Sequence, residues 1–443
     1  MFWKRRIRGD TVAFENAEVK ILDAGKVLDT NPELYKKRAL DALERQYYQD
    51  AMLEAEKAIK YGRNERKYQI VKAKVLLARG EYNSFLVYIL KETRLWEYKD
   101  ISFELTDEEK DFMLYGFSVS YGQLGYPPDK LPEIILTADG KGMCKSIQEA
   151  ADKYSDKKIM LTGGWYNEDL CVKGKAITII GSSYSKAKIN GRWKIVDSRC
   201  TINNILFHNQ AYVAGNMLEL SYSEFSIEGL TFNSLVDPDS IIPNPDDGEC
   251  YEDLVGLYIK ESESIDKNGI NNMRFSNLTS GIICTETQFL INKSIFDQCK
   301  GGIINYNKKR ESIITISNCV FKENYFGCFA TRNAVITIQY STFERNDFAF
   351  GLTKDSMVDE KYVEDVPGKI TAINNCQIIG SKIVAINNQG GTCIVKDSLL
   401  KNNAREYYEE GKATYLKERV TETGNTSTGP LKEGIKGFIK SLL

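Results

Sequence analysis

The stretch "IITISNCVFKEN", residues 313–324, combines two short alternating patterns that are out of phase with each other. The first pattern ends at Ile316, and the second begins at Cys319 and includes Phe321. Side chains alternate between the two faces of a strand, so one straight strand cannot place Ile316 and Cys319 on the same face. The polar pair Ser317–Asn318 between them therefore predicts a corner that joins two short strands.

The same pattern recurs along the second half of the chain. Each copy places an apolar residue, most often Phe, five positions after an Ile or Val, and most copies lie 21 to 25 residues apart. A period of this length is typical of one coil of a solenoid. Asn and Asp, which tolerate left-handed backbone, gather between the two apolar positions and favour a corner there. The eight copies are Ile202…Phe207, Ile227…Phe232, Ile270…Phe275, Ile291…Phe296, Ile316…Phe321, Ile338…Phe343, Ile373…Ile378 and Val395…Leu400.

Three residues after the Phe position, asparagine recurs at Asn324, Asn346 and Asn403. In stacked coils these amides would hydrogen-bond to one another along the solenoid axis, so we interpret them as structural. With the repeated corners, they give the chain a resemblance to the right-handed parallel β-helix of the pectin-lyase-like superfamily. The resemblance implies an α + β solenoid in which about 9–10 β-helix coils occupy residues 128–404.

A second resemblance lies at the start of this region. The stretch "ADGKGMCKSIQEAADKYSDKKIMLTGGWYNEDLCVKGKAITIIGSS", residues 138–183, is similar to the opening of pectin methylesterases. It implies a cap helix at 146–154 that covers the open end of the first coil. The catalytic motifs of methylesterases, pectate lyases and polygalacturonases are absent after Gly181, so the resemblance does not extend to their activities.

No catalytic cluster emerges from the remaining sequence. Asp297, Lys322 and Arg345 are single catalytic candidates just after the Phe positions, where a solvated corner residue is the simpler interpretation. Cleavage of a polysaccharide would need either a correctly spaced carboxylate pair or a calcium-assisted base, commonly Arg or Lys, and the sequence offers only these single candidates. His208 follows the inward-facing Phe207, and we expect it at the surface or at a corner.

Residues 31–127 have a helical pattern instead. Ala39, Leu43 and Tyr48 recur 34 residues later as Ala73, Leu77 and Tyr82. The spacing and the small residues resemble the tetratricopeptide repeat, which would provide a concave peptide-binding groove. A plain helical bundle is the alternative. Residues 1–30 form a separate N-terminal segment without an assigned fold.

Composition limits the classes of partner and cofactor. The 443 residues contain 59 Lys and Arg against 61 Asp and Glu, so the net charge of -2 does not favour a nucleic-acid binder. The basic N-terminus "MFWKRRIRGD" precedes no apolar run, and we expect no signal peptide, no membrane span and a cytoplasmic location. Ten scattered Cys and one His predict neither a disulfide framework nor a metal site, and no cofactor is expected.

Two acidic insertions interrupt the repeat. Residues 237–267 hold ten acids against two lysines, and residues 355–365 hold five acids against one lysine. Both follow the Phe half of a coil, so we expect them on one side, where they would rim an acidic trough. Solvated loops, a basic peptide partner, calcium and a carbohydrate are all open interpretations. The residues predicted to bind a partner there are Asp246, Asp247, Glu249, Glu252, Asp253, Asp359, Glu360, Glu364 and Asp365.

Three segments are expected at the C-terminus: a cap helix over 405–420, a flexible linker over 421–430 and an amphipathic helix over 431–443. The last of these has Ile435, Phe438, Ile439 and Leu442 on one face. This face is predicted to dock on the protein itself, on a membrane surface or in the groove of a partner.

The favoured hypothesis is a non-catalytic cytoplasmic scaffold that binds protein partners through its helical-repeat and β-helix surfaces. The alternative is a carbohydrate-active β-helix enzyme or glycan binder, which aromatic side chains beside a carboxylate or basic side chain on the trough floor would favour. A spacer within a larger assembly is a third hypothesis. The sequence specifies neither the ligand nor the oligomeric state.

Overall fold

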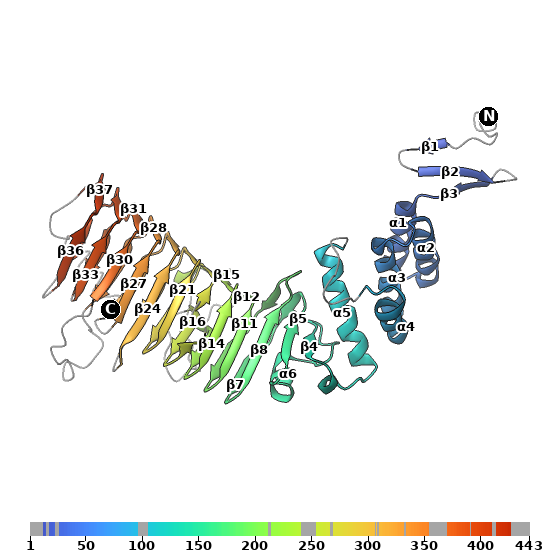
Figure 1. Ribbon diagram of the computed structural model, residues 1–443, viewed down its shortest axis with the longest axis horizontal. Coiled ribbons are helices and arrows are strands. Elements are labelled where there is room, and N and C mark those ends of the chain that lie inside the picture. Colours follow the sequence, from blue (N-terminus) through green and yellow to red (C-terminus); the bar gives the residue numbers. More distant parts are fainter. Residues whose placement is uncertain are drawn as a thin grey trace. The chain divides into compact units, whose positions relative to one another are not determined.

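The computed structural model describes residues 12–14, 17–22, 26–95, 105–210, 214–240, 254–265, 269–305, 307, 310–331, 334–353, 370–389, 391–409 and 413–426. The chain divides into two compact units. The first comprises Met1–Leu131 with Ile135–Lys145, and the second comprises Pro132–Ile134 with Ser146–Leu443. Figure 1 shows helices in the first unit and stacked strands in the second.

The first unit contains the predicted helices, preceded by a small antiparallel sheet. The sheet consists of β1 (Val12–Phe14), β2 (Ala17–Leu22) and β3 (Lys26–Asp29). The helices are α1 (Pro32–Glu44), α2 (Tyr48–Tyr61), α3 (Arg66–Ala78), α4 (Tyr82–Val87), which continues as the π-helical turn η1 (Tyr88–Glu92), and α5 (Asp107–Gln123). Ala39 and Ala73, which lie 34 residues apart in the sequence, are both fully buried between helices. No described helix is long and apolar enough to cross a membrane.

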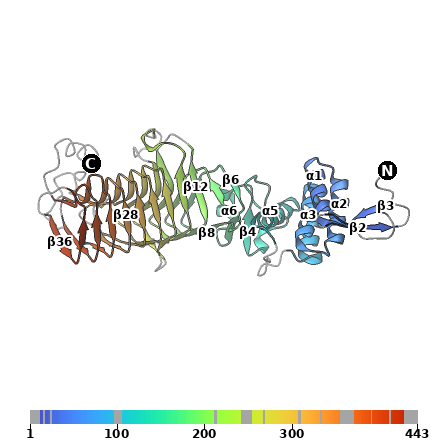
Figure 2. The same ribbon diagram turned by 90° about the horizontal axis from the view of Figure 1, so that it is seen from above.

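The second unit is a parallel β-helix, as predicted, and it is built from three sheets. Figures 1 and 2 show its strands stacked coil upon coil along one axis. The Ile sheet contains the strands with the Ile of the repeat, the Phe sheet contains those with the Phe, and the third, which we call the Gly sheet, closes each coil. The Ile sheet begins with the strand β4 (Glu133–Leu136). The short helical turns η2 (Pro128–Lys130) and η3 (Pro238–Ser240) and the helix α6 (Ile147–Lys153) complete the elements.

The strands of the three sheets have the following bounds. The Ile sheet contains β5 (Lys158–Leu161), β8 (Ala176–Gly181), β11 (Arg199–Asn203), β14 (Glu224–Glu228), β17 (Glu263–Ser264), β18 (Ile270–Asn271), β21 (Gln288–Asn292), β24 (Ser312–Ser317), β27 (Ala334–Gln339), β30 (Ile370–Asn374), β33 (Thr392–Lys396) and β36 (Thr414–Glu418). The Phe sheet contains β6 (Gly164–Tyr166), β9 (Ala187–Ile189), β12 (Ile205–Asn209), β15 (Thr231–Ser234), β19 (Arg274–Ser276), β22 (Ile295–Asp297), β25 (Val320–Lys322), β28 (Thr342–Glu344), β31 (Gln377–Ile379), β34 (Leu399–Lys401) and β37 (Thr421–Thr423). The Gly sheet contains β7 (Leu170–Lys173), β10 (Trp193–Val196), β13 (Gly215–Ser221), β16 (Leu254–Lys260), β20 (Ser280–Thr285), β23 (Gly301–Asn305), β26 (Phe326–Thr331), β29 (Phe348–Thr353), β32 (Val384–Asn388) and β35 (Tyr407–Glu409).

The shift of phase in the repeat is a corner between the Ile and Phe sheets. In six coils the second residue of the predicted polar pair has a positive φ, between 50° and 56°. This left-handed conformation reverses the chain direction within two residues, and Asn and Asp adopt it at low cost. The six residues are Asn204, Asn272, Lys293, Asn318, Asn375 and Asp397.

A column of six phenylalanines fills the core on the side of the Phe sheet. Neighbouring rings stack nearly parallel, with centroids 4.6 to 5.1 Å apart. Glycines of the Gly sheet face this column because a Cβ there would collide with the rings. A Cβ at Gly302, for example, would lie 2.9 Å from Cδ1 of Phe321. Where Ile378 and Leu400 continue the column, Ala349 and Ala385 replace glycine in the Gly sheet, and both are fully buried.

The predicted asparagine ladder is confirmed. Asn346 accepts hydrogen bonds at Oδ1 from the backbone N and from Nδ2 of Asn324, at 2.9 and 3.0 Å. Its own Nδ2 donates to the carbonyl oxygen of Phe321 at 2.9 Å. Asn403 makes equivalent contacts with Asn425. These amides satisfy buried backbone groups at the corners, so their role is structural.

The C-terminal cap helix predicted over 405–420 is wrong. This segment forms β35 and β36, and β37 follows inside the stretch expected to be a linker. The three strands pair in parallel with β32, β33 and β34, and so add one more coil. Pairing satisfies the exposed backbone edge of the preceding coil, which a helix of this sequence would cover only in part. The predicted docking residues in 431–443 lie outside the described residues.

The acidic insertions also differ from the prediction. Residues 254–260 and 263–264, expected within the first insertion, are the regular strands β16 and β17. Residues 237–253 separate β15 of the Phe sheet from β16 of the Gly sheet, whereas the second insertion separates β29 of the Gly sheet from β30 of the Ile sheet. The second insertion therefore does not follow the Phe half of a coil, and the common side expected for the two insertions stays a prediction. The acidic residues predicted to bind a partner in these insertions lie outside the described residues.

Candidate functional site

A groove of about 750 Å³ lies on the outer face of the Gly sheet. Lys194, Glu219 and Tyr258 come from β10, β13 and β16 and lie directly beside one another in the parallel register. Their neighbours in each strand, such as Leu218 and Leu220, are fully buried. Because side chains alternate along a strand, burial of these neighbours places the polar row on the outer face.

Glu219 is the centre of a polar network in this groove. Its carboxylate lies 3.1 Å from Nζ of Lys194, and only 15% of its side chain is exposed. Ser221 Oγ donates to it at 2.9 Å and Asn216 Nδ2 at 3.4 Å. Asn216 is only 9% exposed, and its Oδ1 has no hydrogen-bond partner among the described residues. The groove therefore contains a carboxylate that Lys194, Ser221 and Asn216 hold in place.

One end of the groove is shaped by an arginine that lies over a glycine. The backbone N of Arg192 donates to Asp169 Oδ1 at 2.7 Å, and its guanidinium donates to the carbonyl oxygen of Ala214 at 2.6 Å. A Cβ on Gly215 would lie 2.6 Å from Cζ of Arg192, and the φ of Gly215 is 141°. Glycine is thus needed for the close approach. Arg192, Asp169 and Asn216 also line a smaller cavity of about 240 Å³ that reaches His208.

His208 lies within the strand β12 of the Phe sheet, not at a corner. Only 9% of it is exposed, so the expected surface position is wrong. Its ring meets the Trp165 ring edge-to-face, with centroids 5.3 Å apart, and Nζ of Lys188 lies 5.2 Å from the centroid of Trp165. Burial, and then the charge of Lys188, lower the pKa of His208 below its usual value of 6.5.

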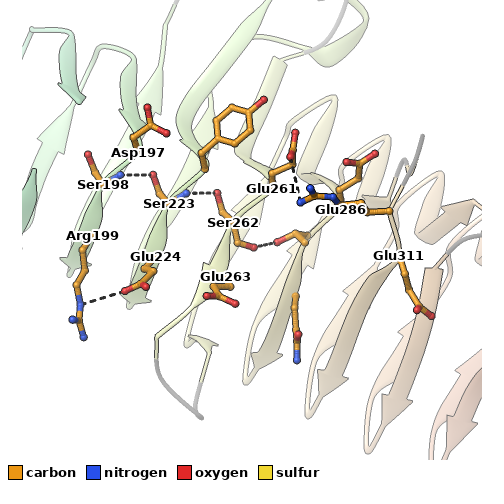
Figure 3. A pocket seen from close by; sticks show the side chains of 14 residues that line it. Asp197, Ser198, Arg199, Ser223, Glu224, Glu261, Ser262, Glu263, Glu286 and Glu311 are labelled. Carbon is orange, nitrogen blue, oxygen red and sulfur yellow. Dashed lines mark hydrogen bonds and ion pairs between the residues drawn. The ribbon is translucent and has the colours of Figure 1, made fainter. Parts of the chain in front are cut away.

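A second groove, of about 670 Å³, follows the corner between the Gly and Ile sheets (Figure 3). Acidic side chains form two rows along it. Asp197, Glu261 and Glu286 lie on one side of a line of stacked serines. Glu224 and Glu263 lie on the other side, beside Arg199. Arg199 pairs with Glu224 at 3.7 Å, and Arg310 pairs with Glu261 at 3.8 Å.

The serines form the floor of this corner groove. The backbone N of Ser198 donates to Ser223 Oγ at 3.1 Å, and the backbone N of Ser223 donates to Ser262 Oγ at 2.9 Å. The hydroxyls of Ser198, Ser223 and Ser262 each donate in turn to the carbonyl oxygen of the residue two positions earlier in the chain, at 2.7 to 2.8 Å. The hydroxyls are therefore bonded within the fold, and the carboxylates line the groove on either side of them.

Tyr222 lines both grooves and joins them. It occupies the left-handed corner position between β13 and β14, with a φ of 53°, and is 47% exposed. Lys260, from the next coil, places its Nζ 5.7 Å from the centroid of the Tyr222 ring. The exposed ring of Tyr222 thus lies beside the ammonium group of Lys260 in the groove on the Gly sheet.

The three catalytic candidates from the sequence lie elsewhere. Asp297 and Lys322 are in register on the outer face of the Phe sheet, and Arg345 pairs with Glu323 at 2.7 Å. None of them lines the three grooves described above. The described residues contain no group of three or more His, Cys, Asp or Glu side chains that could hold a metal ion.

Comparison with known proteins gives likeness only at the level of solved structures. No family model and no curated protein sequence matches the chain. A polygalacturonase from Erwinia carotovora ssp. carotovora superposes with a TM-score of 0.36 at 9% identity, covering 66% of this chain and 97% of that one. An alginate lyase from Paenibacillus sp. str. FPU-7 has a TM-score of 0.37 at 12% identity, covering 64% and 99%. A mannuronic acid specific polysaccharide family 6 lyase from human gut microbiota has a TM-score of 0.33 at 11% identity, covering 70% and 94%.

Proposed function

We propose that the β-helix binds a polysaccharide along the outer face of the Gly sheet. The observation that carries the proposal is the pair Tyr222 and Tyr258, which line the groove beside Lys194, Glu219 and Lys260. Sugar rings present apolar C–H faces and polar hydroxyl edges. A tyrosine ring packs against the former, and charged side chains hydrogen-bond to the latter.

The polar groups of the groove suit hydroxyl ligands. Glu219 and Lys194 offer an acceptor and a donor within one network, and charge-assisted hydrogen bonds are the stronger class.

The scaffold hypothesis has different support. It rests on the helical-repeat surfaces, on the acidic insertions and on the segment 431–443. The residues predicted to bind a partner in the insertions and in that segment lie outside the described residues, and the hypothesis stays a prediction. The cytoplasmic location stays a prediction as well. The condition set from the sequence concerned the floor of the acidic trough and stays untested there. The groove on the Gly sheet supports the glycan alternative on its own, because it places tyrosine rings beside a carboxylate and basic side chains.

Retention of the full chain in gels that contain soluble polysaccharides tests the proposal. The informative variant is Tyr222→Ala, and the matched control is Tyr340→Ala. Tyr340 is also a left-handed corner residue, with a φ of 53° and 60% exposure, but it lines none of the three grooves. We expect Tyr222→Ala to weaken binding about tenfold, equivalent to about 1.4 kcal/mol, while Tyr340→Ala leaves it unchanged.

Two results would contradict the proposal. One is the absence of retention by any polysaccharide of a panel that includes neutral, acidic and amino-containing polymers. The other is an equal loss of binding in the Tyr222 and Tyr340 variants, which would place the ligand outside the groove. Release of shortened products during retention would add cleavage to the proposed binding.

A further inference from the structure

We infer that the glycan site continues around a corner of the β-helix to Trp165, on the outer face of the Phe sheet. This inference rests on the proposed function and adds a second aromatic contact to it. Trp165, in β6, is 38% exposed, whereas its neighbour Tyr166 is buried. Because side chains alternate along a strand, the indole points outward from the solenoid. It offers a flat apolar ring of the kind that packs against the C–H face of a sugar.

The cavity of about 240 Å³ links this ring to the groove on the Gly sheet. On the side of the Phe sheet, His208 and Asn209 of β12 line the cavity. On the side of the Gly sheet, Asp169, Arg192 and Asn216 line it, and the same three residues line the groove. The lining is therefore continuous from the groove, across the corner between the two sheets, to His208.

His208 joins the cavity to Trp165. The two rings meet edge-to-face with centroids 5.3 Å apart, and Nζ of Lys188, which is in register with Trp165, lies 5.2 Å from the centroid of the indole. These contacts orient the indole and still leave it 38% exposed. The lowered pKa keeps the imidazole neutral at pH 7, so its two nitrogens are one donor and one acceptor, as suits sugar hydroxyls.

The path from Tyr222 to Trp165 runs along the strands, across the width of the Gly sheet. Gly215, at the start of β13, lines the cavity, and Tyr222, just after the end of β13, lines the groove. The seven residues of β13 span about 23 Å at about 3.3 Å per residue. A disaccharide is too short to contact both aromatic residues, whereas a longer chain contacts both at once. The second contact is then intramolecular, so affinity should rise with chain length.

Retention of the full chain in gels that contain hydroxyethyl cellulose, polygalacturonate or chitosan measures the contribution of Trp165. We expect Trp165→Ala to weaken binding of the retained polymer about tenfold, and Trp165→Phe to restore most of the affinity because it keeps a ring. Ile295→Ala is the matched control. Ile295 lies in the same outward row of the Phe sheet and is 39% exposed, but it lines neither the grooves nor the cavity.

Calorimetry with a disaccharide and an octasaccharide of the retained polymer separates a ligand contact from a structural effect. Trp165→Ala should lose affinity for the octasaccharide and keep that for the disaccharide, which binds in the groove beside Tyr222. Unchanged binding of the octasaccharide by Trp165→Ala, or an equal loss in Ile295→Ala, would overturn the inference and leave binding in the groove standing. An equal loss for both oligomers would also overturn it. Absence of retention of the unaltered chain by all three polymers would overturn the proposed function itself.

Discussion

Replacing Phe321 by leucine should destabilise the β-helix more than the same change at Phe343. Phe321 stacks on two rings, Phe296 at 4.7 Å and Phe343 at 4.6 Å. Phe343 stacks on Phe321 alone within the column, because Ile378 is its neighbour in the next coil. Both side chains are fully buried, so the loss of apolar area is the same in the two variants.

The expected difference follows from the number of lost ring contacts. Each aromatic pair contributes about 0.5–1.5 kcal/mol beyond its buried area, so Phe321→Leu loses about 1–3 kcal/mol through two pairs and Phe343→Leu about half of that. The assay is equilibrium unfolding in urea, followed by circular dichroism and checked for an unchanged dependence on denaturant. Because repeat proteins can unfold in parts, the comparison is made between the two variants, which lie in adjacent coils. Equal destabilisation would refute the additive stacking model of the column.

Three further predictions concern the ladder, the histidine and the groove cysteine. Asn346→Ala should lower the free energy of unfolding by about 2–6 kcal/mol, because it leaves two buried backbone groups without a hydrogen bond at about 1–3 kcal/mol each. Asn425→Ala, at the partly exposed end of the ladder, should lower it by less. Because the pKa of His208 is lowered in the folded protein, the unfolded chain binds a proton at His208 more readily than the folded chain does. The free energy of unfolding, relative to that of the His208→Gln variant, should therefore fall as the pH decreases from 6.5 through the folded pKa. A difference between the two proteins that does not vary with pH would contradict this. Cys171 is the exposed cysteine among those described and lines the groove, so a bulky thiol reagent should label it and block polysaccharide retention, and Cys171→Ser should prevent the block.

The sequence was sufficient to predict two of the three sheets. The corner between them is marked by polar residues at fixed positions, and the φ values of Asn318 and its equivalents confirm it. The Gly sheet was missed because its strands have no such marker. Segments such as Gly301–Asn305 and Phe326–Thr331 are nearly continuous apolar runs in which glycine or alanine occupies the position that faces the Phe column. Glycine inside a strand resembles a turn signal unless the opposing side chain is known.

The C-terminal coil shows how tertiary pairing overrides local preference. The stretch "YYEEGKATYLKERV" is rich in Glu, Lys, Ala and Leu, which favour a helix. In the structure its residues pair with the last open strands instead, for example Cys393 with Tyr415 and Ile394 with Leu416. The unpaired N–H and C=O groups of that edge lie beyond the segment itself, so its sequence alone does not reveal them.

Along one row on the outer face of the Gly sheet, the type of side chain changes from one group of coils to the next. Lys194, Glu219 and Tyr258 occupy the outer face of the Gly sheet in three consecutive coils, and the same row continues through the next coils as Ile283, Ile304 and Phe329. The inward positions are fixed by the columns of the core, but the outward positions of all six coils have the same backbone and the same register. Ile283 and Phe329 are only 8% and 5% exposed, and the Phe329 ring contacts that of Phe326, so packing within the protein accounts for the apolar half of the row. The polar half has no such cover, because Glu219 and Tyr258 line a groove. The proposed glycan binding would account for that half, since the same coils carry the held carboxylate of Glu219 and the exposed ring of Tyr222.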